Sequence, residues 1–127
     1  MKRLLGIAII AFFLLTVPAH AESVTILSAK TVTGTSDSFR PPVGRGVDQT
    51  AYRTFQVALS GTGAVTATVA IECSNDGINW ETAITFSLSG TSSAHDGNYY
   101  VNSWTYTRAN VTAISGTSAA VTVIGGW

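Results

Sequence analysis

The sequence predicts an all-β fold, a single antiparallel β-sandwich of the jelly-roll or Ig-like kind with about seven strands. Apolar and polar residues alternate with a period of two, which is the period of a half-buried strand. Clusters of Gly, Asn, Asp and Ser interrupt this alternation about every 8 to 12 residues, as turns between short strands do. Hydrophobic residues make up 46% of the chain and charged residues 11%, so a packed core is expected and disorder is not.

Residues 1–21 predict export and lie outside the predicted domain. A basic start (1–3), an apolar run (4–17) and a small-residue end at Ala21 are the three parts of a secretory signal peptide. The apolar run is shorter than the roughly 20 residues that a membrane-spanning helix needs. We therefore expect cleavage after Ala21, a β-sandwich domain over residues 22–127, and a secreted or extracellular protein, with the cell surface or periplasm as variants. After cleavage no membrane association is expected; an uncleaved membrane anchor is the alternative.

The predicted domain carries few charges. The chain has seven basic and seven acidic residues, and because Lys2 and Arg3 precede the domain, five basic residues remain against seven acidic ones, a net charge of −2 with His neutral. The sequence contains no basic patch, so nucleic acid is not an expected partner. A surface with few charges and many hydroxyl groups occurs in proteins that pack against copies of themselves, and equally in monomeric secreted β-domains.

The segment 65–88 predicts a central hairpin. Its two alternating runs are separated by Asn75, Asp76 and Gly77, residues that accept the positive φ of a tight turn. Trp80 has the inward parity of the second run, so we expect it to anchor the core. An exposed platform for stacking sugars is the alternative for Trp80.

Cys73 is the single cysteine of the chain, so no internal disulfide can form. Its parity places it on the inward face with Val69 and Ile71, where a buried thiol acts as a small hydrophobic side chain. An intermolecular disulfide is the alternative. A nucleophilic role is not expected, because only His95 could activate the thiol and no residue is placed to orient His95.

Further strands are predicted on both sides of the hairpin. Residues Tyr52–Ser60 alternate as a strand with Phe55, Val57 and Leu59 inward, and Gly61–Gly63 is expected to turn this strand back into the hairpin as a meander. We also expect a first strand over Val24–Leu27, a proline- and glycine-rich loop over Arg40–Gly46, an exposed loop over Gly90–Asn98, a strand region over Tyr99–Val111, a turn over Ser115–Ser118 and a last strand over Ala119–Ile124.

No group of residues predicts catalysis. Asn75 and Asp76 offer too few oxygen ligands for calcium, and the adjacent His95 and Asp96 would point apart on a strand. The acidic residues occur singly, without the paired carboxylates of glycoside hydrolysis. We therefore expect a protein that is not an enzyme, with no catalytic residue, no cofactor and no metal site.

Aromatic residues predict a contact face. Tyr99, Tyr100, Trp104 and Tyr106 follow the predicted polar loop, and Trp127 ends the chain. Exposed residues of these types serve as binding anchors, while packing and strand propensity are the alternative reasons for their presence. Trp127 is expected either to fray or to dock on a neighbouring molecule.

Two segments resemble a known family. The segment 74–80, Ser-Asn-Asp-Gly-Ile-Asn-Trp, resembles the Ser-x-Asp-Gly-x-x-Trp hairpin of a β-sandwich domain found in structural proteins of tailed phages, including head-decoration and tail-fibre-associated proteins. The segment 104–117 is similar to the strand and turn that close such domains. The resemblance spans about Val24 to Ile124 and implies a structural role. The Asp-Gly-x-x-Trp element also recurs in discoidin-like carbohydrate-binding sandwiches.

Together these observations predict a secreted, non-enzymatic structural subunit that assembles with copies of itself into a filament or a surface or virion-like assembly. Unpaired strand edges offer the mechanism, because their N–H and C=O groups can accept a strand from a neighbour. The alternative is a carbohydrate- or cell-surface-binding module that uses the aromatic cluster, with surface glycans as partners. The candidate assembly residues lie in the first and last predicted strands: Val24, Ile26, Leu27, Val121 and Val123.

Overall fold

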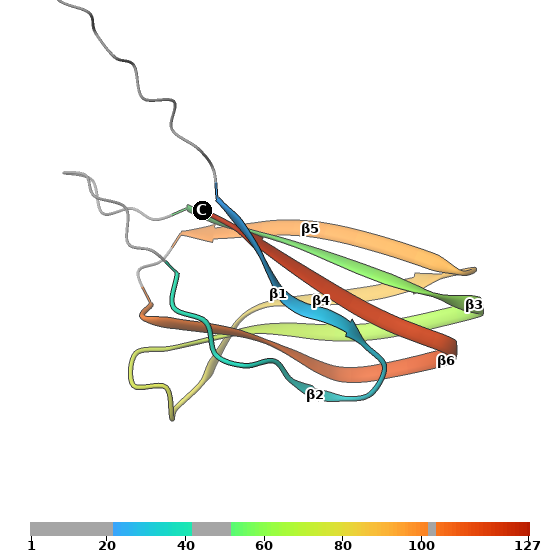
Figure 1. Ribbon diagram of the computed structural model, residues 1–127, viewed down its shortest axis with the longest axis horizontal. Coiled ribbons are helices and arrows are strands. Elements are labelled where there is room, and N and C mark those ends of the chain that lie inside the picture. Colours follow the sequence, from blue (N-terminus) through green and yellow to red (C-terminus); the bar gives the residue numbers. More distant parts are fainter. Residues whose placement is uncertain (1–21, 42–51, 102–103) are drawn as a thin grey trace, which may run out of the picture.

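The computed structural model describes residues 22–41, 52–101 and 104–127, so the predicted signal peptide and most of the predicted loop Arg40–Gly46 lie outside the described residues. The described residues form six strands in one antiparallel sheet and no helix, which confirms the all-β antiparallel class (Figure 1). No described segment is a helix that could cross a membrane. The strands are β1 (Ser23–Lys30), β2 (Gly34–Thr35), β3 (Tyr52–Ser74), β4 (Glu81–Gly90), β5 (Ser93–Val101) and β6 (Tyr106–Gly126).

Two long bent strands, β3 and β6, form the centre of the sheet. They pair with each other from Thr54↔Gly126 at one end to Ser74↔Tyr106 at the other. Along β3 every second side chain is buried, which is the period that the sequence predicted. The alternation therefore identified the inward face of β3 correctly on both sides of its bend.

The two glycine-containing segments predicted as hairpin turns are bends within these strands. At Gly61–Gly63 in β3 and Ser115–Ser118 in β6 the pairing register shifts, and Gly63 and Gly116 have positive φ. The two halves of β3 do not pair with each other as a hairpin would, because β3 pairs with β6 on both sides of the bend. A bulge with a glycine at positive φ bends a strand strongly without ending it. The predicted meander from Tyr52 onward is therefore wrong.

The bends fold the sheet so that its two halves face each other (Figure 1). β5 pairs with the first half of β3 and β4 with the second half, and the short connection between β4 and β5 lies at the same end as the bends. On the other side of β6, β1 pairs with its second half and β2 with its first. The core lies between the two halves and consists mainly of aliphatic side chains with Phe55 and Phe86.

The predicted exposed loop Gly90–Asn98 is mostly strand β5. Its backbone pairs with β3 residue by residue from Ser60↔Ser93 to Tyr52↔Val101 without a register shift. The polar composition of this segment reflects an exposed position at the edge of the sheet, not irregular backbone. The predicted strand region Tyr99–Val111 is accordingly divided between the end of β5 and the start of β6.

Trp80 lies outside the core, so the predicted core anchor is wrong. In the β3–β4 pair, Ile71 is opposite Ile84 but Glu72 is opposite Thr82, which leaves one extra residue in β4. A one-residue bulge exchanges the two faces of a strand for every residue beyond it. The half-buried Trp80 ring consequently packs under the Arg108 guanidinium, whose Cζ lies 4.0 Å from the ring centroid.

The predicted tight turn after β3 is confirmed. Gly77 has a φ of +73°, and the carboxylate of Asp76 accepts hydrogen bonds from the backbone N–H groups of Ile78 and Asn79, each at 2.8 Å. The Asn79 side-chain amide and the Ser74 hydroxyl also donate to this carboxylate. These donors, with the Asn79 backbone N–H first, hold the pKa of Asp76 well below its usual range.

The turn predicts a specific acid sensitivity. Because the pKa of Asp76 is lower in the folded than in the unfolded state, its stabilising contribution is present above the unfolded pKa and is lost as the pH falls toward the folded-state pKa. We expect the urea midpoint of the wild type to fall more between about pH 5 and about pH 2 than that of Asp76→Asn. Asp37→Asn removes an exposed carboxylate outside this turn and is the control; its urea midpoint should fall as much as that of the wild type. Parallel curves for all three proteins would contradict this account.

Candidate functional site

The edges of the sheet are the first candidate site. In one half of the folded sheet the strand order is β1, β6, β3, β5, so β1 and β5 lie at its two ends. The last predicted strand, with Val121 and Val123, is part of β6 and lies between β1 and β3. Both valines are fully buried, and neither edge of β6 is free there. The expectation that this strand accepts a neighbour is therefore wrong.

The first predicted assembly strand does lie at an edge. Val24 and Ile26 of β1 are half-buried, and Leu27 contributes to the core. The pairing of β1 with β6 shifts register twice after Thr25, and Ala29 has a φ of +45°. β1 is thus a regular edge only near its start and is twisted away from regular pairing near its end.

The five aromatic residues predicted as a contact face lie in separate places. Tyr99 is exposed on the outer face of β5, next to Tyr52, with ring centroids 6.4 Å apart. Tyr106 lies under the guanidinium of Arg40, and Trp127 stacks on Phe39 with centroids 4.7 Å apart. Trp127 therefore docks on its own chain, contrary to both predicted alternatives.

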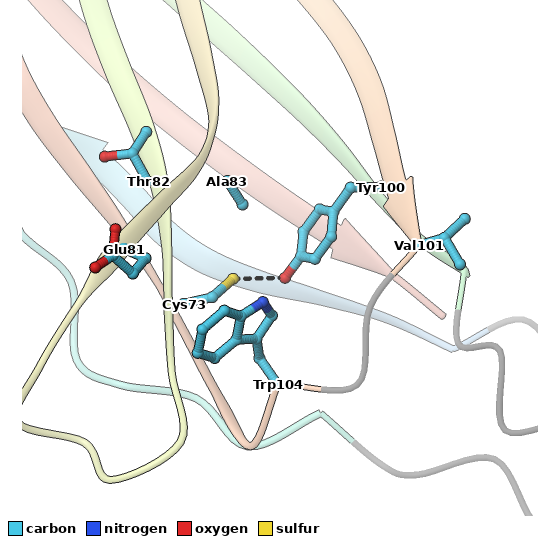
Figure 2. Close-up of a pocket in the computed structure, with 7 residues that line it drawn as sticks. All are labelled: Cys73, Glu81, Thr82, Ala83, Tyr100, Val101 and Trp104. Carbon is cyan, nitrogen blue, oxygen red and sulfur yellow. Dashed lines mark hydrogen bonds between the residues drawn. The ribbon is translucent and has the colours of Figure 1, made fainter.

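Tyr100 and Trp104 do meet, at a pocket between the start of β4 and the end of β5 (Figure 2). Tyr100 stacks on Phe55 with ring centroids 5.6 Å apart, and its hydroxyl lies 2.6 Å from the Cys73 sulfur. The pocket has a volume of about 340 Å³, within the range of small-ligand sites. Its lining residues are Cys73, Glu81, Thr82, Ala83, Tyr100, Val101 and Trp104.

The Cys73 thiol and the Tyr100 hydroxyl line the pocket as neutral hydrogen-bonding groups, and Cys73 is not placed to act as a nucleophile. Burial raises the pKa of the Cys73 thiol, and burial together with the Cys73 contact raises the pKa of Tyr100 to about 12. Both groups are thus protonated at neutral pH, whereas the thiolate is the nucleophilic form of cysteine. The predicted burial of Cys73 is confirmed, and its thiol is free.

Two residues of this region had not been singled out from the sequence. Arg53 is 1% exposed, and its guanidinium donates to the Thr107 hydroxyl at 3.3 Å and to the Trp104 carbonyl at 2.9 Å. Arg53 thereby positions the backbone of Trp104 beside the pocket. The sequence could have revealed the burial of Arg53, because Arg53 has the same inward parity in β3 as Phe55. Glu81 reaches the pocket through the bulge in β4, which sequence parity could not reveal.

The other predicted positions form no further cluster. His95 and Asp96 lie next to each other in β5, and both are exposed. Among residues 22–41, 52–101 and 104–127, no three His, Cys, Asp or Glu side chains are grouped so that they could hold a metal ion.

Comparisons with known proteins support the fold. No protein-family model matches the chain, and no curated protein matches it in sequence. The crystal structure of PBSX exported protein XepA is similar to this chain, with a TM-score of 0.51 and 13% sequence identity over 83% of this chain and 36% of that one. At this identity the likeness is one of fold, and this chain matches only about a third of that protein's length. The β-fold of this chain is therefore similar to part of a phage-related exported protein.

Proposed function

We propose that this protein is an exported, non-enzymatic structural subunit, built on a β-sandwich, that associates with copies of itself through the edges of β1 and β5. The predicted signal peptide supports export, as does the fold similarity to a protein described as exported. The resemblance of the segment 74–80 to phage structural domains supports the structural role. The low charge of residues 22–127 is compatible with close packing of identical copies.

The observation that carries the proposal is the direction of the two edge strands. All neighbours in the order β1, β6, β3, β5 are antiparallel, so β1 and β5 run in opposite directions. β5 of one copy can therefore lie beside β1 of the next copy and continue the antiparallel sheet. The pairing of β1 with β6 is regular from Ser23 to Thr25 and then shifts register, so the contact would form at the start of β1. Repetition of this head-to-tail contact gives a closed ring or an open filament.

Exposed apolar side chains beside the β5 edge add to this argument. Tyr52, Tyr99 and Val101 are 63%, 61% and 46% exposed, and the register places them together at one end of the outer face. Grouped exposed apolar residues mark interaction surfaces more often than single ones do. A neighbouring copy paired to β5 would cover part of this patch.

The test is the oligomeric state of the purified protein and of a variant with a blocked β5 edge. We expect sedimentation velocity and negative-stain microscopy to show rings or filaments for the wild type. Gly97→Pro removes one N–H group from the edge and should abolish assembly. Gly97→Ala keeps that N–H group, and its Cβ would lie at ordinary contact distance (3.5 Å) from the Phe55 carbonyl, so it should assemble normally. A wild type that stays monomeric at every concentration would refute the proposal.

The pocket favours a second candidate function, the binding of a glycan. Trp104 and Tyr100 offer aromatic surface, and Glu81 and Thr82 offer hydrogen-bonding groups around the same space. We expect chemical-shift changes on titration with oligosaccharides to be lost in Trp104→Ala and retained in Tyr106→Ala, whose ring packs under Arg40 away from the lining residues. Unchanged spectra across a broad set of glycans would eliminate this candidate.

A further inference from the structure

The hydrogen-bonding pattern of β5 shows which of its backbone groups face the free edge. The Gly61 N–H donates to the Ser92 carbonyl, in line with the register Ser60↔Ser93. In an antiparallel pair, hydrogen-bonded residues alternate with residues whose N–H and C=O groups point to the other side. The even-numbered residues of β5 therefore bond to β3, and the odd-numbered residues direct their backbone groups away from it.

Two of these outward N–H groups are already occupied by side chains of the same strand. The Gly97 N–H donates to Asp96 Oδ1 at 2.8 Å, and the Tyr99 N–H donates to Asn98 Oδ1 at 2.8 Å. Asp96 and Asn98 have the inward parity of β5 but are exposed, so their side chains are free to turn toward the edge. The same arrangement thus occurs twice, at consecutive outward positions in the middle of the strand.

We propose that Asp96 and Asn98 are gatekeepers of the β5 edge, and that β1 of a second copy pairs with β5 only by displacing both side chains from the Gly97 and Tyr99 N–H groups. This inference rests on the proposed assembly function and names its regulation. A capped N–H group cannot donate to an incoming strand, so only a partner whose carbonyl groups replace both caps at once gains from pairing. Native edge strands carry such devices against unselective pairing.

The start of β1 makes it the appropriate partner strand. Glu22 exchanges backbone hydrogen bonds with Trp127, and the pairing of β1 with β6 is regular from Ser23 to Thr25, so the backbone groups of Ser23 and Thr25 point away from β6. These two residues can lie opposite Tyr99 and Gly97 of a neighbouring copy, where their carbonyl groups would replace the two caps. Beyond Thr25 the pairing of β1 with β6 shifts register twice, so the start of β1 is the part that would pair.

Two measurements on the full exported protein test the inference. Amide hydrogen exchange, followed by NMR at concentrations below the onset of association, reports each cap separately. We expect Asp96→Ala to accelerate exchange at Gly97, and Asn98→Ala at Tyr99, by roughly fivefold to tenfold, the value of one hydrogen bond. His95→Ala, at a neighbouring exposed position of β5, should leave both amides unchanged.

Sedimentation equilibrium then measures whether removing the two caps lowers the concentration at which the protein associates. The double variant Asp96→Ala, Asn98→Ala should associate at a concentration at least about tenfold lower than the wild type, because two capped groups are released. Asp96→Asn keeps an acceptor oxygen and should retain slow exchange at Gly97. If Asp96→Asn instead promotes association as strongly as Asp96→Ala, charge repulsion and not capping controls the edge, and the inference is overturned.

The outcomes separate this inference from the proposed function. Two results would overturn the gating role while leaving assembly intact. One is unchanged amide exchange in both alanine variants. The other is a double variant that associates at the same concentration as a wild type that assembles. If the wild type stays monomeric at every concentration, the assembly function fails, and the gating role, which rests on it, fails with it.

Discussion

Replacing Phe86 by alanine is expected to lower the free energy of unfolding by about 3–5 kcal/mol. Phe86 is 1% exposed and lies in the inward row of β4, opposite Val69 of β3. Its removal leaves a cavity between the two halves of the sheet, which the long paired strands β3 and β6 cannot easily close. Since domains of this size are stable by only about 5–15 kcal/mol, the variant should be largely destabilised at physiological temperature.

Trp80→Ala is the matched comparison, because parity alone predicts the same role for both residues. Trp80 is only half-buried, so its truncation removes a partly buried ring and its contact with Arg108. The expected loss in the free energy of unfolding is about 1–2 kcal/mol. Urea denaturation of both variants, followed by far-UV circular dichroism, measures the difference. Equal losses, or a larger loss for Trp80→Ala, would show that the bulge in β4 does not place Trp80 outside the core.

Gly116→Ala is expected to cost about 2–5 kcal/mol, from strain and steric contact together. Gly116 has a φ of +120°, and an added Cβ would lie 2.7 Å from the Ala64 carbonyl oxygen and 2.7 Å from a methyl group of Val65. The first of these is a backbone atom of the bend in β3, so relief requires the two bends to move apart. The substitution therefore tests whether the sheet folds where β3 and β6 bend together.

Gly63→Ala separates the two contributions. Gly63 also has a positive φ, +70°, but an added Cβ would meet no atom within 4 Å. Only the conformational cost remains, about 1–2 kcal/mol. Thermal unfolding of both variants should show the larger decrease for Gly116→Ala. A larger decrease for Gly63→Ala would indicate that the close approach at Gly116 is absent in solution.

The candidate sites were only partly predictable from the sequence. The aromatic residues after β4 were identified as a group, yet only Tyr100 and Trp104 meet at the pocket. Whether neighbouring side chains on a strand share a site depends on which face each occupies and on what packs against that face. Tyr99 and Tyr100, adjacent in sequence, accordingly lie on opposite sides of β5.

The assembly strands show the same dependence on partners. Val24–Leu27 and Ala119–Ile124 both read as short apolar strands, and only pairing distinguishes the edge strand β1 from the interior strand β6. The caps at Gly97 and Tyr99 become visible only once the direction of each N–H group is known. Strand order is set by contacts between segments far apart in the chain, and no local pattern records it.

The sequence by itself determined the all-β class, the inward row of β3 and that of β4 from Ile84 to Leu88, the burial of Cys73 and the turn at Asp76 and Gly77. Each of these follows from local properties, namely the two-residue period of an extended chain and the φ values that Gly, Asn and Asp accept. Only the tertiary structure decided that β3 and β6 bend as continuous strands instead of forming hairpins, that the bulge in β4 places Trp80 outside the core, and that β1 and β5 are edges. The physical reason is that register, bulges and strand order depend on the partner strand, and a bulge of one residue reverses every face beyond it.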